Sequence, residues 1–278
     1  MNSTPLVSVV IPTYNRLAFL TEAVQTVLAQ TFTDYELIVV DDGSTDRTAA
    51  MVQGVADPRV TLVSLPHVGS PARARNAGIR RARGRYVAFL DSDDLWDPSK
   101  LLDQLAALAG RPECRWCTTG VRIVDETGAP HPRWRTHPPP PEGWIFEPLV
   151  WRQVGMSTST ILVERALLLE VGGFDETFVA GEDYDLCVRL ALRSPIARVL
   201  EPRVRGRIHA GQFVGRGWEW PVIRTLGKMA RSAPGWRLRS LCAREALQVA
   251  VLYASRRVRA VVRRALPRRP DPMPARRG

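Results

Sequence analysis

The sequence is poor in the residues that build disulfide-rich, zinc-binding or membrane-spanning proteins. Its four cysteines are too few and too scattered for a disulfide framework. Cys114 and Cys117 form one CxxC pair with His131 and His137 downstream, but zinc needs a second ligand pair at matching spacing, so we assign no metal there. No apolar run reaches the about 18 residues that a transmembrane helix requires.

The first residues do not follow the pattern of a secretion signal. Residues 1–5 carry no positive side chain, and the apolar run 6–11 is too short for the hydrophobic region of a signal peptide. Hydrophobic residues make up 45% of the chain and charged residues 24%, which are the values of a folded globular protein. We therefore expect a soluble protein of the cytoplasm.

Lysine is nearly absent, and the positive charge is unevenly distributed. Lys100 and Lys228 are the only lysines among 39 basic residues, and the formal net charge is +11. Residues 222–278 hold 15 of the basic residues but only Glu245 and Asp271 of the 28 acidic ones, so the preceding residues are close to neutral. This distribution predicts a neutral domain over residues 1–221 and a basic extension over 222–278.

Short runs of β-branched residues alternate with helical patterns along the first part of the chain. The expected strands are 7–11, 36–40, 60–65, 86–90, 117–124 and 159–163. The expected helices are 17–28, one that Asp46 helps to start and that carries Ala49, Ala50 and Val52, 72–83, one that begins at Asp97 and Pro98, and 184–192. This alternation predicts an α/β fold with a mostly parallel sheet flanked by helices.

Acidic clusters follow two of the expected strands. Asp41 and Asp42 close the second strand, and Asp91, Ser92 and Asp93 close the fourth. Ligands bind outside the carboxyl ends of strands in open α/β sheets, so both clusters should face one crevice. Crowded carboxylates repel unless a cation joins them, and Mg²⁺ with a diphosphate meets that need. The alternative is that each cluster only caps a turn.

Several sequence blocks, in order and over residues 7 to about 192, resemble the family 2 glycosyltransferases. The blocks are VSVVIPTYNR (7–16), DDGSTD (41–46), ARNAG (74–78), DSD (91–93), GGFDE (172–176) and GEDYDL (181–186). The resemblance implies the GT-A (Rossmann-like) fold, a nucleotide-diphosphate-sugar donor, Mg²⁺ or Mn²⁺, and inversion at the anomeric carbon.

The resemblance also implies roles for individual residues. Those assigned to the nucleotide sugar are Pro12, Tyr14, Asp41, Asp42, Arg75, Asn76, Asp91 and Ser92. In this assignment Asp42 accepts the ring N–H of the base, and Arg75 reaches the diphosphate. Asp93 aligns with the metal ligand and Asp91 with its partner, while the segment RIH (207–209) places His209 as a further metal ligand.

Asp183 matches the general base of the family, with Glu182 as its neighbour. An acceptor hydroxyl is a poor nucleophile at neutral pH and needs a carboxylate within hydrogen-bond reach. A single base suffices for direct displacement, which inverts the anomeric configuration. The alternative for Asp183 is helix capping, a role that Asp185 could fill instead.

The basic extension contains apolar residues at helical spacing. They are Leu238, Leu241, Cys242, Ala246, Val249, Leu252 and Tyr253, with arginines on the other faces. Two interpretations stay open: a helix on an anionic membrane surface, or a helix packed on the catalytic domain with a disordered Arg/Pro-rich end. The extension lacks RNA-binding aromatic motifs, so we expect no nucleic-acid partner.

The expected function is metal-dependent, inverting sugar transfer from a nucleotide-diphosphate sugar, with a uridine diphosphate sugar as donor. The expected acceptor is a hydroxyl group of a cell-envelope or exopolysaccharide precursor, at the inner face of the plasma membrane. The alternatives are transfer onto a polyprenyl phosphate, a nucleotidyltransferase, and a non-catalytic nucleotide-sugar-binding module.

Overall fold

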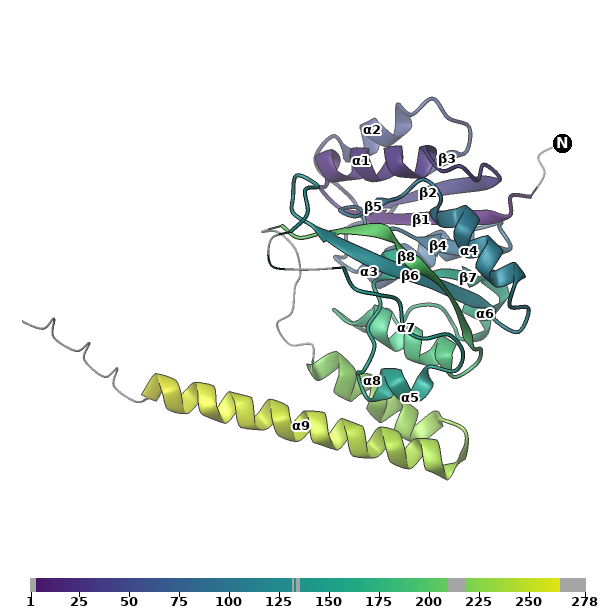
Figure 1. The fold of residues 1–278 in the computed structure, drawn as a ribbon. Coiled ribbons are helices and arrows are strands. Elements are labelled where there is room, and N and C mark those ends of the chain that lie inside the picture. Colours follow the sequence, from purple (N-terminus) through teal and green to yellow (C-terminus); the bar gives the residue numbers. More distant parts are fainter. Residues whose placement is uncertain (1–3, 132, 134–135, 210–218, 266–278) are drawn as a thin grey trace, which may run out of the picture. The chain divides into compact units, whose positions relative to one another are not determined.

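A computed structural model describes residues 4–131, 133, 136–209 and 219–265, with side chains up to residue 254 (Figure 1). The chain divides into two compact units, Met1–Pro221 and Val222–Gly278. Each unit is described by itself below.

The first unit is built on one mixed, eight-stranded sheet with the strand order β3-β2-β1-β4-β7-β6-β8-β5 (Figure 1). The strands are β1 (Val7–Thr13), β2 (Tyr35–Asp41), β3 (Val60–Ser64), β4 (Tyr86–Phe89), β5 (Leu95–Trp96), β6 (Trp116–Val124), β7 (Leu162–Glu164) and β8 (Ile196–Arg207). Strands β1 to β4 are parallel, as are β6 and β8, while β7 and β5 pair antiparallel with their neighbours. The predicted α/β fold with a mostly parallel sheet is confirmed.

The helices of the first unit connect these strands. They are α1 (Leu17–Leu28), α2 (Thr48–Gln53), α3 (Pro71–Arg81), α4 (Lys100–Ala109), α5 (Phe146–Val150), α6 (Arg165–Glu170) and α7 (Glu182–Ala191), with a 3-10 turn η1 (Thr158–Thr160). Every residue of β2 is buried, because side chains from both faces of the strand meet helices. One face packs with Val24 of α1 and Leu101 of α4 in the main core.

The opposite face of the sheet meets α3 at a very close approach. A Cβ atom at Gly78 of α3 would lie 2.3 Å from Cγ1 of Val10 in β1, so only glycine allows this contact. Helix α3 begins at the N-cap Ser70, whose hydroxyl accepts from the backbone N–H of Arg73 at 3.3 Å, followed by Pro71 at the first position. The start of α3 is thereby fixed beside the carboxyl ends of the strands.

The register of the central strands brings the acidic clusters to one edge. Thr13 at the end of β1 lies opposite Asp41 at the end of β2, and β4 runs parallel to β1 on its other side. Asp42 and Asp91 therefore leave the sheet from strands on either side of β1. This arrangement follows from parallel pairing, which places all three carboxyl ends together.

Two local predictions differ from the structure. Helix α4 begins at Lys100 after Ser99, and not at Asp97, whose carboxylate instead lies 3.5 Å from Nε of Arg205. Residues 159–160 lie in the 3-10 turn η1, and the strand that was expected there begins at Leu162. Strand β8 is an addition to the predicted elements, because its many arginines hide the apolar alternation.

The second unit contains most of α8 (Glu219–Ser232) and all of α9 (Gly235–Ala265). Within α9, Cys242, Glu245 and Val249 are buried, while Trp236, Leu247 and Val251 are exposed. None of the helices in the described part of the chain is long and apolar enough to span a membrane.

Candidate active site

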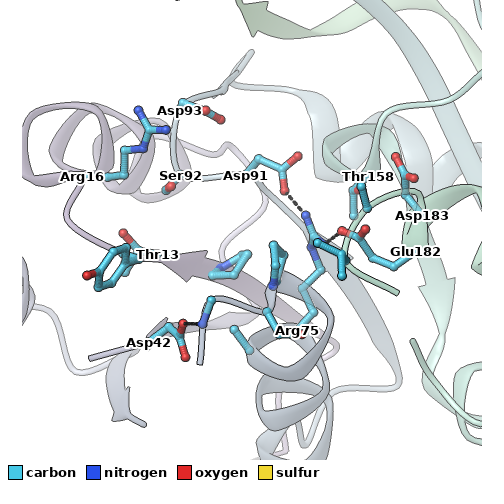
Figure 2. A pocket seen from close by; sticks show the side chains of 18 of the residues that line it. Thr13, Arg16, Asp42, Arg75, Asp91, Ser92, Asp93, Thr158, Glu182 and Asp183 are labelled. Carbon is cyan, nitrogen blue, oxygen red and sulfur yellow. Dashed lines mark hydrogen bonds and ion pairs between the residues drawn. The ribbon is translucent and has the colours of Figure 1, made fainter. Parts of the chain in front are cut away.

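A pocket of about 580 Å³ opens at the carboxyl ends of the central strands (Figure 2). This volume is in the range of small-molecule sites. The predicted site residues that line it are Pro12, Tyr14, Asp42, Arg75, Asp91, Ser92, Asp93 and Asp183. Segments far apart in the sequence thus meet around one cavity.

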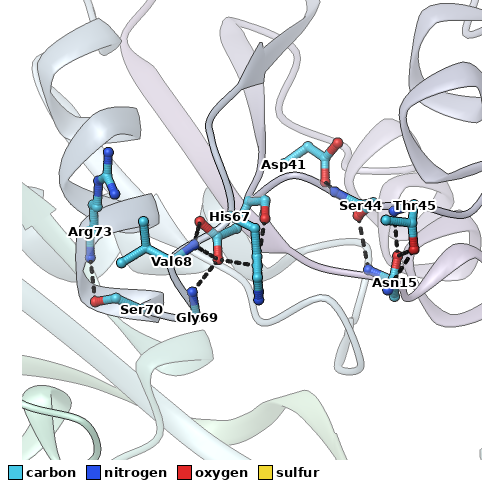
Figure 3. Close-up of polar contacts among 10 residues, drawn as sticks. Asn15, Asp41, Ser44, Thr45, His67, Val68, Gly69, Ser70 and Arg73 are labelled. Atoms are coloured by element: carbon cyan, nitrogen blue, oxygen red, sulfur yellow. Dashed lines mark hydrogen bonds and ion pairs between the residues drawn. The ribbon is translucent and has the colours of Figure 1, made fainter.

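Asp42 lies at one end of the pocket, directly after β2. Its carboxylate accepts hydrogen bonds from the backbone N–H groups of Gly69 at 2.8 Å and Val68 at 3.3 Å, and it lies 3.0 Å from Nδ1 of His67 (Figure 3). The ring of Tyr14 stacks on the His67 ring with centroids 3.9 Å apart. This end therefore combines a fixed carboxylate acceptor with an aromatic surface.

Asp93, in the turn between β4 and β5, pairs with His209, which follows β8. Oδ2 of Asp93 lies 3.0 Å from Nε2 of His209, whose side chain is buried and packs against the ring of Phe19. The backbone N–H of Asp91 is held by the hydroxyl of Ser159 at 3.0 Å. The acidic turn is therefore anchored on two sides.

Arg75 joins the two acidic segments of the pocket (Figure 2). Its guanidinium bonds Oδ1 of Asp91 at 2.6 Å and Oε1 of Glu182 at 2.7 Å. Burial opposes the charge of Arg75, but the two carboxylates outweigh it and raise its pKa further. Burial raises the pKa of Asp91, which Arg75 counteracts and Asp93 reinforces. In this structure the Arg75 charge neutralises protein carboxylates.

Asp183 lines the pocket from the first turn of α7. The helix starts there because Gly181 takes a left-handed conformation with φ of 75°, and a Cβ atom at Gly181 would lie 2.4 Å from Cβ of Pro221. Burial, followed by the charge of Glu182, raises the pKa of Asp183 to about 6. Asp183 is thus a carboxylate tuned toward proton uptake near neutral pH.

Helix α7 has Gly181 at its N-cap with no side-chain capping hydrogen bond, and Asp185 stabilises the helix in another way. Its carboxylate is fully buried and forms an ion pair of 2.7 Å with Arg189, one turn later in α7. Asp183 therefore lines the pocket, whereas Asp185 stabilises helix α7 through its ion pair.

Two predicted nucleotide-binding residues, Asp41 and Asn76, lie outside the lining of this pocket. Oδ1 of Asp41 accepts from the backbone N–H and hydroxyl of Ser44, which closes the turn after β2 (Figure 3). The amide of Asn76 bonds both backbone groups of Phe174 at 2.8 and 2.9 Å. The structure gives each of them a role in shaping a loop.

Sequence reasoning missed a buried network behind the acidic turn. Oδ2 of Asp94 accepts from the Ser159 hydroxyl at 2.6 Å, and Oδ1 accepts from the backbone N–H of Arg207 at 3.0 Å. Burial, with added repulsion from Asp91 and Asp93, raises the pKa of Asp94 to about 8. The doubled aspartate after Ser92 was the available signal, but its partners are remote in sequence.

The donor set fits a divalent cation only in part. The carboxylates of Asp91 and Asp93 line the pocket and suit Mg²⁺ or Mn²⁺, whereas the imidazole of His209, 3.0 Å from Asp93, is a ligand more typical of transition metals than of Mg²⁺. Within the described ranges, no group of three or more His, Cys, Asp or Glu side chains is already arranged to hold a metal.

The fold is that of the GT-A glycosyltransferases. The structure of S. aureus TarS 1-349 in complex with UDP-GlcNAc aligns with a TM-score of 0.68 and 21% identity, over 87% of this chain and 72% of that one. The same topology is thus found in a solved protein of this fold.

The chain belongs to glycosyltransferase family 2. The family model Glycosyl transferase family 2 matches residues 8–163, and Glycosyltransferase like family 2 matches residues 145–238. The chain is also similar to the E. coli UDP-Glc:alpha-D-GlcNAc-diphosphoundecaprenol beta-1,3-glucosyltransferase WfgD, with 39% identity over 103 residues (37% of this chain, 41% of WfgD). The Rhizobium meliloti succinoglycan biosynthesis protein ExoO is 44% identical over 101 residues (36% of this chain, 29% of ExoO), so this chain spans less than half of either relative.

Proposed function

We propose that this chain transfers a sugar from a uridine diphosphate sugar to an acceptor hydroxyl, with inversion at the anomeric carbon. One observation carries the proposal: a single pocket is lined by Asp42, by the acidic turn 91–93 and by Asp183. These groups match the base, the diphosphate and the acceptor of such a reaction, in that order along the cavity.

Asp42 would select the base. An ionised carboxylate only accepts hydrogen bonds, so it favours a base with a ring N–H, such as uracil, over one without. Guanine also has a ring N–H, but TarS was solved with UDP-GlcNAc and WfgD is named for UDP-Glc, so uridine is the donor base that we propose.

Asp183 would act as the general base. The acceptor hydroxyl gives its proton to the Asp183 carboxylate while its oxygen forms a bond to the anomeric carbon. The bond between that carbon and the phosphate oxygen breaks, and the electron pair leaves with the nucleotide diphosphate. Attack opposite to the leaving group inverts the configuration.

Asp93, His209 and Asp91 would hold Mg²⁺ or Mn²⁺ together with the donor diphosphate. When bound, the cation neutralises negative charge on the leaving phosphate as a Lewis acid. Arg75 has a different part in this proposal, because it fixes Asp91 and Glu182 and so sets the distance between the donor side and the acceptor side of the pocket.

The proposed acceptor is a lipid-linked precursor of a cell-envelope polysaccharide. WfgD is named for a diphosphoundecaprenol acceptor and ExoO for succinoglycan biosynthesis. An acceptor with a polyprenyl tail stays in the bilayer, so the enzyme would act at the cytoplasmic surface of the membrane.

Helix α9 has a surface suited to that location. Trp236, Leu247 and Val251 are 78, 65 and 59% exposed, and at 100° per residue they fall on one stripe of the helix. The exposed arginines Arg237 and Arg244 border one side of this stripe, and the exposed Arg239 borders the other. An apolar stripe bordered by arginine suits an anionic lipid surface.

This exposed stripe differs from the apolar face that the sequence indicated. Cys242 and Val249 of that predicted face are buried, with exposures of 0 and 1%. The proposed membrane surface is therefore the exposed stripe, and not the apolar face that contains Cys242 and Val249.

The activity is tested with radiolabelled UDP-sugars and Mn²⁺. We expect UDP release, and transfer when a membrane extract supplies the lipid acceptor, and we expect Asp183→Asn to abolish transfer while UDP binding persists. Binding of UDP-sugar without turnover on any acceptor would indicate a binding module instead. Pyrophosphate release from a nucleoside triphosphate would indicate a nucleotidyltransferase, and transfer onto polyprenyl phosphate alone would identify that phosphate as the acceptor.

The membrane proposal is tested by flotation on vesicles with 30% phosphatidylglycerol. The full chain should float with these vesicles and not with neutral ones. A triple variant with Trp236, Leu247 and Val251 changed to Ser should stay at the bottom, whereas Leu200→Ser, an exposed apolar residue of β8, serves as the control and should float. Equal flotation of both variants would refute the proposal.

A further inference from the structure

His67 contacts two residues of the proposed base site at once. It lies between β3 and α3, next to Val68 and Gly69 (Figure 3). Its ring is stacked on Tyr14 at 16° between the planes, and Nδ1 approaches Asp42. Nδ1 is 2.8 Å from the backbone oxygen of Asp42 and 3.0 Å from Oδ2 of its carboxylate. One side chain thus contacts both the aromatic surface and the acceptor that would meet a base.

The two neighbours of Nδ1 determine where the proton lies. A carbonyl oxygen and an ionised carboxylate oxygen are both acceptors, so Nδ1 carries a hydrogen and donates it. His67 therefore holds Asp42 in place through the side chain and through the main chain.

The two carboxylate oxygens of Asp42 differ in how many hydrogen bonds they already accept. Oδ2 accepts from the backbone N–H of Gly69 at 2.8 Å and lies 3.0 Å from Nδ1 of His67, while the backbone N–H of Val68 lies 3.3 Å from both oxygens. Oδ1 therefore keeps the greater capacity to accept a further hydrogen bond. A ring N–H of a base is a group of the matching kind.

The backbone fixes His67 before any ligand arrives. Gly43, directly after Asp42, has φ of +77°, and a Cβ atom there would lie 2.7 Å from the backbone nitrogen of His67. The loops after β2 and β3 are therefore packed main chain against main chain. This rigid contact limits the positions that the imidazole can take.

We infer that His67 is a positioning residue that sets base recognition in this pocket. By covering one face of Tyr14 it leaves the other face for a stacked base. By bonding the backbone oxygen of Asp42, with Nδ1 3.0 Å from Oδ2, it fixes the carboxylate so that Oδ1 is left for the ring N–H. The inference rests on the proposed function, because it assumes a nucleotide in the pocket. Contacts that are in place before binding increase affinity, because fewer side chains lose conformational freedom when the nucleotide binds.

Two substitutions separate the two contacts. His67→Phe keeps a flat ring to stack on Tyr14 and removes the Nδ1 donor, whereas His67→Asn keeps a donor near the position of Nδ1 and removes the ring. The probes are UDP and N3-methyl-UDP, which lacks the ring N–H, and the measurement is calorimetric titration with Mn²⁺. His137→Phe and His137→Asn, at an exposed position with backbone pairing to Val121, are the matched controls.

We expect wild-type protein to prefer UDP over N3-methyl-UDP. His67→Phe should bind UDP about tenfold more weakly and N3-methyl-UDP almost normally, so that the preference narrows. His67→Asn should weaken both nucleotides by a similar factor and keep the preference. The His137 variants should match wild type in every titration.

Four results would overturn the inference. Unchanged UDP affinity in both His67 variants would show that neither contact matters, and equal loss for both nucleotides in both variants would show a merely structural role. Equal wild-type affinity for UDP and N3-methyl-UDP would show that the ring N–H is not read, although the proposed transferase would stand. A wild-type protein that binds no nucleotide would instead refute the proposed function, and the inference with it.

Discussion

Replacement of Asp183 by Asn should make the protein more stable and inactive at the same time. The pKa of this carboxyl is about 6 in the folded protein, against 3.8 for an unperturbed aspartate, because burial disfavours its charged form. At pH 7.5 the folded protein keeps it ionised at a cost of up to about 1.4 kcal/mol per pKa unit, or about 3 kcal/mol in all. Water in the open pocket reduces this cost, so we expect a gain of about 1–3 kcal/mol in the free energy of unfolding.

The gain should depend on pH in a defined direction. An acid whose pKa is raised by folding destabilises the protein as pH rises through the window between the unfolded and folded values. The difference between Asp183→Asn and wild type should therefore be small below pH 4, should grow up to about pH 6, and should stay constant above it. The same carboxylate must be ionised to accept a proton, so wild-type turnover should rise with pH through about 6.

Thermal and urea unfolding of the ligand-free proteins between pH 4 and 8 measures the gain in the free energy of unfolding. UDP-sugar turnover measures the loss of activity, which we expect to be at least about a hundredfold. The matched control is Asp185→Asn, two residues further along α7, which breaks the buried ion pair with Arg189 and should lower stability. A stability difference that is absent at pH 7.5, or that is constant from pH 4 to 8, would refute the reasoning about burial. Retained activity would refute the assignment of the base.

Three further variants test other parts of the structure. Burial lowers the pKa of Lys100 to about 7, so the stability of Lys100→Met relative to wild type should be higher at pH 7 than at pH 10 in unfolding experiments, and a difference that does not change with pH would contradict this; the bond from Lys100 to Gln104 is lost at both pH values. Gly78→Ala should cost about 1–3 kcal/mol in the free energy of unfolding, since its Cβ would overlap Val10; a neutral result would show that α3 shifts freely. Arg75→Met removes a charge that lowers the pKa of Asp183, so the acid limb of the pH–rate profile should move to higher pH, and an unmoved limb would contradict that coupling.

The predictability of the fold varied along the chain for a physical reason. Runs such as 36–40 are continuous and apolar because both faces of β2 are covered, so the strand could be read from the sequence. Strand β8 could not, because it carries Arg203, Arg205 and Arg207, whose charges are satisfied by acids such as Asp103, Asp97 and Glu22 from distant segments. Local patterns do not contain such partners.

The residue types of the site, and the edge of the sheet at which they lie, could be predicted from the order of residues along the chain. Acidic residues placed directly after parallel strands must emerge at the same edge, whatever the rest of the chain does. The contacts of each residue are set by the folded chain. Arg75 forms ion pairs with Asp91 and Glu182, Asn76 bonds the backbone of Phe174, and His67 contacts Asp42. Hydrogen bonds and burial depend on partners brought together by folding, and it is these partners that set the charge and orientation of each group.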